Sequence, residues 1–470
     1  MTAGGVLSRI VRGSRLKYLG LSFVLTWHYC LWFVPGSFPD TFLLDDRITF
    51  SWLIALACTV LTVGLLALVL GQKRHFPRHP AYGLTVCAGG SVATAALTMG
   101  VTLSPVLVYA AAVVVGVSAG LLWVMWGERL SRQHAKFTML KLAPTYGVTL
   151  LAGLAWTFFA PGLLAPILVS LLPLASGALL FVSWRRAPVF PFTPVLPRPV
   201  ARQAYRSIGT VGAISFVAVF MSYFVVAIVP WSDLWDVGRS FTLGVAIGAV
   251  FVLIIAIAQL VTPARSTAFR LFPWLLFLII IACLLCALGM RLDFVGFLLA
   301  LAVSSVFEVL FVLYMARLTL SGYIAAAAAF GLSAATIRLG ICLGNAMALT
   351  YERVPPLLET MTVPTLLVFM AILAGLLIPL VRQEYTINDL ARSPQDASEW
   401  DTIVSRTAEE FRLSTREKEI VELLGRGYTA SAIAEKLVIS PHTVNTHVQH
   451  IYDKMGIHKR SELLDYLNKR

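Results

Sequence analysis

Charged residues are scarce in this chain of 470 residues. Asp, Glu, Lys and Arg make up 13% of the sequence and hydrophobic residues 58%, whereas a typical soluble domain carries roughly a quarter charged residues. A soluble globular protein is therefore disfavoured, because too few charged side chains are available to cover its surface. The composition indicates a chain whose main solvent is lipid.

Cysteines are also few, and all six fall inside apolar segments. They are Cys30, Cys58, Cys87, Cys283, Cys286 and Cys342. The pattern predicts small apolar side chains within helices and gives no indication of a disulfide framework or a metal site. Because the chain also lacks a nucleophile–base arrangement and a phosphate-binding loop, we expect neither an enzyme nor a bound cofactor.

Twelve apolar runs are each about long enough to cross roughly 30 Å of hydrocarbon as a helix. Their approximate spans are 17–34, 48–70, 82–103, 105–126, 140–160, 163–183, 208–230, 240–262, 271–290, 293–316, 324–349 and 362–381. The basic N-terminus at 1–16 precedes the first run, which lacks a small-residue cleavage site and is predicted to be an uncleaved span. We therefore expect an all-α membrane domain over 17–381.

The loops between these runs alternate in charge. One side carries Lys73, Arg74, Arg78, Arg129, Arg132, Lys136, Lys141, Arg185, Arg186, Arg198, Arg202, Arg206, Arg265, Arg270 and Arg317. The other side carries mainly acidic residues, namely Asp40, Asp45, Asp46, Asp233, Asp236, Asp293, Glu352 and Glu359. Because excess Lys and Arg mark the cytoplasmic side, both termini are predicted to be cytoplasmic in a bacterial inner membrane.

The longest basic loop, 184–207, divides the spans into two halves of six, 17–183 and 208–381. Six plus six spans with both termini inside resembles the layout of the major facilitator superfamily. That family carries a Gly-x-x-x-Asp-Arg-x-Gly-Arg type motif between its second and third spans. Here the segment from Gly71 to Pro80 lacks the Asp and the later glycines, which argues against coupled transport but leaves the fold expected.

Two charged residues lie deep within predicted spans. Glu308 falls in the tenth span and Arg338 in the eleventh, at depths that differ by roughly 5 Å. A charge at the centre of a bilayer is costly, so such residues usually face the interior of a helix bundle. We expect the two to pair, either as a structural ion pair or as part of ligand recognition.

Aromatic residues cluster toward the outer end of the first span. They are Trp27, His28, Tyr29, Trp32 and Phe33. One interpretation is an aromatic belt at the lipid interface. The other is the lining of a site for a small, aromatic ligand, with Trp27, His28 and Tyr29 as candidates.

After residue 381 the hydropathy falls and a different kind of sequence begins. Residues 382–410 are predicted to be a linker that includes a short helix from about Ser398. In 411–470, Ser414 and Glu417 form a capping box that begins one helix, and Thr429 can cap a second. Ser440 can cap a third helix with Pro441 at its first position and Gly456 at its end.

The third of these helices carries a polar face opposite its apolar stripe. Candidate DNA contacts on or beside it are His442, Thr443, Asn445, Thr446, Gln449, His450 and Lys454. Together with Thr415, Gly427 and Ile433-Ala434, the spacing resembles the helix-turn-helix of LuxR-type regulators over about 411–468. The resemblance implies that Asn445, Thr446 and Gln449 read bases and that a fourth helix, from about Ser461 to Leu467, supplies a dimer contact.

These features together predict a one-component transcription regulator embedded in the membrane. The bundle would sense a small molecule, and the cytoplasmic helix-turn-helix would bind promoter DNA, as a homodimer when on DNA. Membrane lipid, promoter DNA and an unidentified small-molecule effector are the expected partners. The alternative is a transporter of the major facilitator type with a regulatory DNA-binding domain, which would move its substrate across the membrane rather than only bind it.

Overall fold

The structure is a computed structural model. It describes residues 19–38, 46–71, 80–100, 104–132, 135–186, 195–196, 198–228, 237–261, 268–289, 292–390, 394–425 and 428–468. These residues form helices and contain no strand, which confirms the expected all-α fold. The basic leader, the motif segment 72–79, the acidic loops 39–45 and 229–236, the basic residue Arg265 and Gly427 lie outside the described residues.

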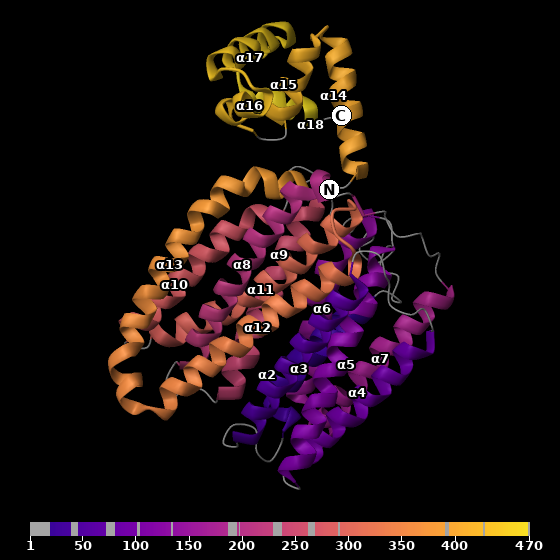
Figure 1. Cartoon of the computed structure of the whole chain (residues 1–470), viewed down its shortest axis with the longest axis vertical. Helices are drawn as coiled ribbons and strands as arrows, with labels where there is room; N and C mark the ends of the chain where they lie inside the picture. Colours follow the sequence, from indigo (N-terminus) through magenta and orange to yellow (C-terminus); the bar gives the residue numbers. More distant parts are fainter. Residues whose placement is uncertain are drawn as a thin grey trace. The chain divides into compact units, whose positions relative to one another are not determined.

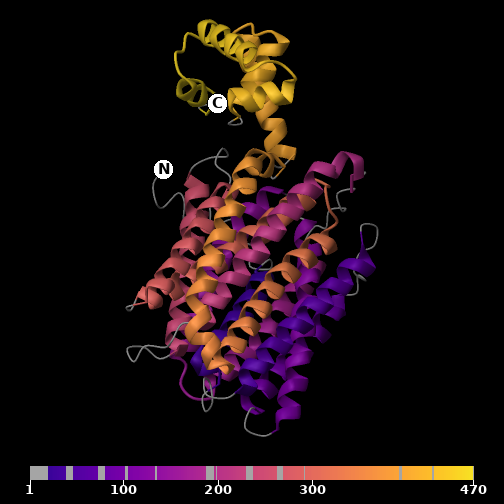
Figure 2. The same ribbon diagram turned by 60° about the vertical axis from the view of Figure 1, so that its left-hand side comes forward.

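The chain divides into two compact units, Met1–Arg382 and Gln383–Arg470. The first contains α2 (Gly20–Phe33), α3 (Asp46–Leu70), α4 (Pro80–Gly100), α5 (Pro105–Ser131), α6 (Ala135–Phe159), α7 (Leu164–Arg186), α8 (Arg198–Ile228), α9 (Val237–Val261), α10 (Phe272–Leu288), α11 (Leu292–Leu320), α12 (Ala326–Arg353) and most of α13 (Pro355–Leu390), with 3-10 turns at Pro35–Ser37 and Ala268–Leu271. Each of these α-helices overlaps one of the twelve predicted spans, and they run alongside one another as a bundle (Figures 1 and 2).

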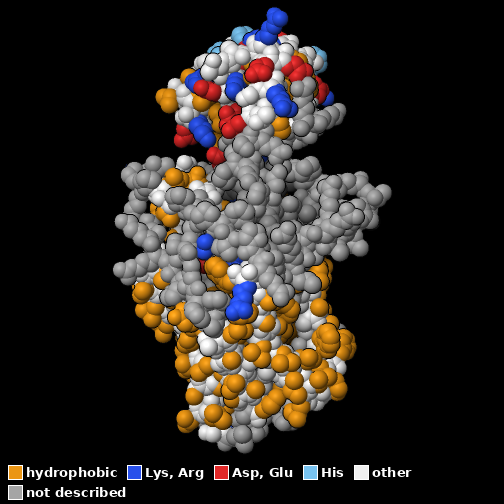
Figure 3. Space-filling view, turned by 90° about the vertical axis from the view of Figure 1, so that its right-hand side faces the viewer, with side chains coloured by type: hydrophobic (Ala, Val, Ile, Leu, Met, Phe, Trp, Pro, Cys, Tyr) orange, Lys and Arg blue, Asp and Glu red, His pale blue; other side chains and the backbone are white. Residues whose placement is uncertain are grey.

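The bundle has an apolar outer surface. Among its most exposed side chains are Leu68 (81%) and Phe159 (79%), and hydrophobic atoms cover much of the described face of the bundle in Figure 3. Over the described residues, ten helices are long and apolar enough to span a membrane, while α2 has 14 residues. Because water would penalise such a surface, the chain is a multi-pass membrane protein.

Close packing of the bundle depends on glycine where two helices touch. A Cβ on Gly116 of α5 would lie 2.3 Å from the carbonyl oxygen of Ala55 on α3, and a Cβ on Gly344 of α12 would lie 2.4 Å from that of Phe220 on α8. Small residues allow helix backbones to approach in this way, which favours association of helices in lipid. These contacts hold α5 against α3 and α12 against α8.

The second unit begins with the last residues of α13 and continues with α14 (Pro394–Glu410), α15 (Thr415–Gly425), α16 (Ala430–Leu437), α17 (Pro441–Met455) and α18 (Arg460–Asn468). Its core is apolar and includes Val404, Ile420, Leu424, Ile433, Val444, Ile451, Leu463 and Leu467. Where the structure describes it, the predicted linker 382–410 is helical, in the end of α13 and in α14, so its helix begins earlier than the predicted Ser398. Val404 is buried in the core, so α14 is part of this unit.

Candidate functional sites

Each helix start predicted in the C-terminal unit has its capping bond. The backbone N–H of Glu417 donates to the hydroxyl of Ser414 (3.3 Å), and the N–H of Ser414 donates to the carboxylate of Glu417 (2.7 Å). Thr429 accepts from the N–H of Ala432 at the start of α16, and Ser440 accepts from the N–H of Thr443 (3.0 Å) at the start of α17. Local sequence therefore sets where these three helices begin.

Helix α17 buries one face and exposes the other. Val444 and Ile451 are fully buried, and Met455 is nearly so. The exposed side chains of the helix include those of His442, Asn445, Thr446, Gln449 and His450. These groups can donate and accept hydrogen bonds, and the exposed face starts at the helix N-terminus, where backbone N–H groups favour phosphate.

Three predicted DNA contacts also have partners inside the domain, and one of them, Thr446, donates its hydroxyl to the carbonyl oxygen of His442 (3.1 Å). The hydroxyl of Thr443 exchanges a hydrogen bond with that of Ser440 (2.8 Å), within the cap of α17. Lys454 donates to the carboxylate of Glu417 (2.6 Å) and to the carbonyl oxygen of Arg412 (3.4 Å). The ammonium of Lys454 therefore links the end of α17 to the start of α15.

Glu417 is buried, and its charge is stabilised locally. Burial alone would raise the pKa of its carboxyl group, but the hydrogen bonds from Lys454 and from the backbone and hydroxyl of Ser414 outweigh burial and hold the pKa below its usual value. Hydrogen bonds and a nearby cation favour the ionised form of a carboxylate. Glu417 thus joins the capping box to the third helix of the domain.

The turn between α16 and α17 contains a valine in an unfavourable conformation. Val438 has φ 55° and ψ 48°, in the left-handed region, and its side chain is 89% exposed. A β-branched residue is rarely found there because its Cβ crowds the backbone. Its N–H is within reach of the carbonyl oxygens of Ala434 and Glu435, which ends α16 and redirects the chain into α17.

The end of α13 is packed into the C-terminal unit. The ring of Tyr385 stacks on that of Tyr428, with centroids 5.3 Å apart. Asp389 lies 3.7 Å from the ammonium of Lys436 on α16, and that ammonium also lies 4.7 Å from the centre of the Tyr428 ring. The last residues of the helix that forms the twelfth span therefore contact the first helix of the helix-turn-helix pair.

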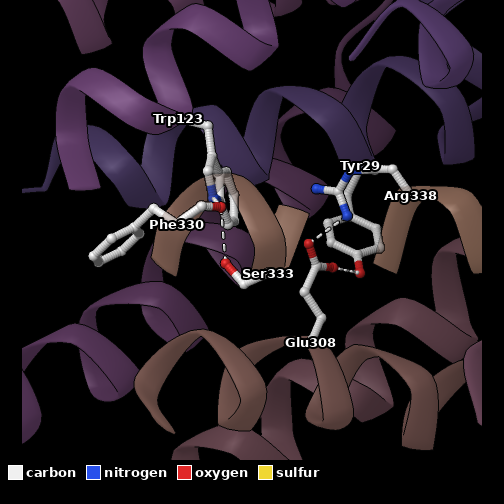
Figure 4. Close-up of polar contacts among 6 residues, drawn as sticks. All are labelled: Tyr29, Trp123, Glu308, Phe330, Ser333 and Arg338. Carbon is white, nitrogen blue, oxygen red and sulfur yellow. Dashed lines mark hydrogen bonds and ion pairs between the residues drawn. The ribbon is translucent and has the colours of Figure 1, made fainter. Parts of the chain in front are cut away.

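The bundle contains the ion pair expected from the sequence. Nη1 of Arg338 on α12 lies 2.5 Å from Oε1 of Glu308 on α11, and both side chains are buried. The hydroxyl of Tyr29 on α2 donates to the second carboxylate oxygen (2.7 Å). Figure 4 shows the carboxylate between these two partners, so the site joins the two halves of the bundle.

An aromatic side chain lies beside this pair. The Arg338 guanidinium lies 5.6 Å from the centre of the Trp123 ring on α5, and the indole N–H of Trp123 donates to the carbonyl oxygen of Phe330 (3.0 Å). That carbonyl also accepts from the hydroxyl of Ser333 (2.9 Å), as Figure 4 shows. The hydrogen bond of Trp123 holds its ring beside the guanidinium of Arg338, and this cation–π arrangement favours the positive charge.

The aromatic cluster of α2 lies inside the bundle and not at the lipid interface. Trp27, Tyr29 and Phe33 are each 1% exposed and Trp32 is 7% exposed, so the aromatic-belt interpretation is wrong. Tyr29 reaches Glu308, whereas the Trp27 N–H donates to the hydroxyl of Thr94 on α4 (3.0 Å). The structure therefore assigns Trp27 to packing between α2 and α4.

Sequence reasoning did not indicate two residues beside the ion pair, or one buried arginine elsewhere in the bundle. Tyr146 and Tyr223 interact electrostatically with Glu308 although they belong to α6 and α8. Arg129, interpreted as a loop charge, is fully buried and donates to the carbonyl oxygen of Ser183 (2.9 Å). Single tyrosines in apolar runs give no pattern that a linear sequence could reveal.

The C-terminal unit matches a known family of regulators. The model of the bacterial regulatory proteins of the luxR family matches residues 412–467. The oxygen regulatory protein NreC of Staphylococcus aureus strain bovine RF122 / ET3-1, and that of strain MRSA252, are each 42% identical over 67 residues. This match covers 14% of the present chain and 31% of those proteins, so the chain spans about a third of the length of these relatives. Residues 412–467 are a luxR-family helix-turn-helix domain.

The membrane unit resembles solved transporters in fold. The human organic anion transporter MFSD10 (TETRAN) has a TM-score of 0.51 at 15% identity, over 79% of this chain and 99% of that one. A bacterial homologue of the iron transporter ferroportin has a TM-score of 0.51 at 14% identity, over 80% and 98%. The Escherichia coli fucose:proton symporter FucP has a TM-score of 0.51 at 13% identity, over 80% and 99%. The twelve-helix bundle therefore has the major facilitator fold.

Proposed function

We propose that this protein is a one-component transcription regulator embedded in the membrane. One observation carries the proposal, namely that a luxR-family domain with an exposed polar face on α17 follows a membrane bundle in the same chain. LuxR-family domains bind DNA, and the bundle occupies the place that a soluble receiving domain would otherwise take. The bundle would sense a small molecule, and the C-terminal unit would bind promoter DNA.

In this proposal, α17 enters the major groove with its N-terminal half. Asn445, Thr446 and Gln449 read base edges, while His442 and His450 contact bases or phosphates. Thr443 contributes through the cap of α17, and Lys454 acts by holding α17 against Glu417. Two copies would bind together through α18, because a dimer doubles the number of base contacts.

The orientation follows from charge. With twelve spans, the two ends of the bundle would lie on the same membrane side, and the excess of basic residues in the loops on that side supports a cytoplasmic location. The DNA-binding unit would then face the chromosome of a bacterium from the inner membrane. A periplasm-active reporter fused after Arg382 should be silent, and an active reporter would contradict this orientation.

We propose that α13 carries the signal. Its last residues, Tyr385 and Asp389, contact Tyr428 and Lys436 within the C-terminal unit. In this proposal, a change in α13 on ligand binding alters these contacts and thereby α16. Asp389→Asn should reduce the response to an inducer while leaving DNA binding by the uninduced protein unchanged, whereas Ser405→Ala on α14 serves as a control that alters neither.

DNA binding tests the proposal. Full-length protein in nanodiscs is used to select sites from a random DNA library, and the variants Thr446→Ala and Gln449→Ala are then compared on a selected site. Each should lose about 1–3 kcal/mol on that site and much less on random DNA, because phosphate contacts supply the non-specific part. Failure to enrich any sequence, or equal losses on both DNAs, would contradict a regulator that reads bases with α17.

A transporter is the second candidate, because the bundle has the fold of solved transporters. Fold similarity at 13–15% identity indicates architecture alone. Uptake of a bound ligand into proteoliposomes separates the two functions. A regulator binds its ligand without accumulating it, whereas a transporter concentrates it when a gradient is applied.

A further inference from the structure

Helix α8 is longer than a membrane span requires, and its excess length is basic. It has 31 residues, of which residues 207–228 contain no charged side chain. At about 1.5 Å per residue this uncharged part covers roughly 33 Å, which is enough to cross about 30 Å of hydrocarbon. The residues before it, including Arg202 and Arg206, therefore lie at the level of the lipid headgroups.

Arg202 and Arg206 are directed away from the rest of the bundle. Both side chains are exposed, whereas Ala201, Ala204 and Ser207 on the same stretch of helix are buried. The two arginines are one helical turn apart and so share a face of α8. Neither side chain forms a hydrogen bond or an ion pair with another described residue, and α8 itself contains no acidic residue. Because positive charge in the first turns of a helix opposes the helix dipole, helix stability does not explain these two residues.

A third arginine adds positive charge at this end of the bundle. Ser207 of α8 shares a hydrogen bond with the hydroxyl of Tyr314 on α11 (2.7 Å). The ring of Tyr314 lies 5.3 Å from that of Phe269, measured between centroids, and Phe269 belongs to the 3-10 turn before α10. Arg270 follows Phe269 and is exposed. Both segments that meet at Tyr314 therefore carry exposed arginines.

The face of α8 that carries the arginines continues as a shallow apolar strip. Gly209 and Ala213 follow Arg206 at helical spacing, and both are exposed. A Cβ placed on Gly209 meets nothing within 4 Å, so the space beside the helix is open there. Further along α8, the ring of Phe220 packs against that of Phe369 on α13, with centroids 5.8 Å apart. The strip thus runs from the arginines toward this aromatic pair.

We propose that this face of α8 binds an anionic phospholipid. The phosphate lies between Arg202 and Arg206, and one acyl chain lies along Gly209 and Ala213. Guanidinium groups bind phosphate through paired hydrogen bonds, and residues without long side chains let an apolar chain approach the helix closely. The arginines lie at headgroup depth and the strip at hydrocarbon depth, so a molecule with both an anionic headgroup and an acyl chain fits the two parts together. The site lies beyond the proposed function, since it requires neither DNA binding nor a sensed ligand.

Native mass spectrometry of the delipidated full-length protein in detergent tests the ligand class. The probe is dioleoylphosphatidylglycerol, which is compared with dioleoylphosphatidylcholine, a lipid with the same chains and phosphate but no net charge. The anionic lipid should bind about fivefold or more tightly, and equal affinity for the two lipids overturns the proposal. Glycerol 1-phosphate, which has the phosphate without the chains, should not displace the lipid at equal concentration. Displacement would identify a site for free phosphate and overturn the lipid.

Arginine variants test the headgroup contacts. Arg202→Gln and Arg206→Gln should each weaken phosphatidylglycerol binding about fivefold, which corresponds to about 1 kcal/mol for one cation near a membrane surface. Neither should lower the melting temperature of the lipid-free protein, because both side chains are exposed and unpaired. The control is Arg239→Gln, which removes an exposed arginine near the start of α9. That variant should bind the lipid as the wild type does.

A glycine variant tests the acyl-chain strip with the arginines intact. Gly209→Leu fills the open space beside α8, so it should weaken phosphatidylglycerol binding at least about threefold. It should leave the melting temperature of the lipid-free protein equal or higher, because leucine favours a helix more than glycine does. The control is Gly89→Leu on α4, where a Cβ also meets nothing within 4 Å, and its lipid affinity should not change. Unchanged affinity in both arginine variants, or in Gly209→Leu, would overturn the site.

Discussion

Breaking the Glu308–Arg338 pair should destabilise the bundle far more than removing both members. Each side chain is buried, with exposures of 2% and 6%, so neither charge can turn to water when its partner is lost. An unpaired buried charge costs about 3–5 kcal/mol. We therefore expect Glu308→Gln and Arg338→Gln each to lower the free energy of unfolding by about that amount, and the double variant to lose much less than their sum.

The tyrosine of the site should matter less than the pair. Tyr29 donates one hydrogen bond to Glu308 (2.7 Å), and interhelical hydrogen bonds in membranes contribute about 0.6 kcal/mol on average and at most about 1.7. Tyr29→Phe should therefore cost less than about 2 kcal/mol. Comparing it with Arg338→Gln separates the contribution of charge from that of hydrogen bonding.

The assay is reversible unfolding of the purified protein in mixed micelles, followed by circular dichroism, with all variants expressed to comparable levels. A coupling energy of several kcal/mol between Glu308→Gln and Arg338→Gln is expected. Strictly additive losses would refute the reasoning, because they would mean that the two charges do not compensate one another. Loss of inducer response in a double variant of normal stability would further assign the pair to sensing.

Three other changes follow from the same kind of argument. The pKa of Glu417 is lowered in the folded protein, so its ionised form stabilises the C-terminal unit above the unfolded pKa of about 4.3. This stabilisation is lost as the pH falls through the lower folded pKa. Acid unfolding of Glu417→Gln should lack that loss, and an acid transition identical to that of the wild type would contradict the prediction. Val438→Gly should raise stability by about 1 kcal/mol by removing left-handed strain at an exposed position, and a lower melting temperature would argue against strain. Gly344→Ala should destabilise the bundle, because its Cβ meets the backbone of α8, whereas Gly375→Ala, which meets nothing within 4 Å, should not.

Local and periodic features made much of the molecule predictable. The twelve apolar runs correspond to α2–α13, and the caps at Ser414, Thr429 and Ser440 begin α15, α16 and α17. The pairing of Glu308 with Arg338 could be predicted from depth alone, because opposite charges buried at similar depth lower the cost of burial by pairing. These features depend on neighbours in sequence or on the cost of burying charge.

Other features depend on how distant helices meet. Tyr146 and Tyr223 reach the ion pair from α6 and α8, and nothing in their own segments distinguishes them from packing residues. Trp27 and Tyr29 are two residues apart, so they point in different directions on a helix, and only the packed bundle shows which faces the site. The left-handed turn at Val438 could not be predicted, because such a position is usually occupied by glycine.

Chromatin occupancy of the full-length protein in cells tests the central claim most directly. Wild-type protein, cross-linked to DNA and recovered from the membrane fraction, should enrich a small set of promoter sites. A Thr446→Ala/Gln449→Ala variant present in the membrane at the same level should lose those sites. Equal enrichment by both proteins, or no enriched site with the wild type, would contradict a membrane-embedded regulator that reads DNA through α17.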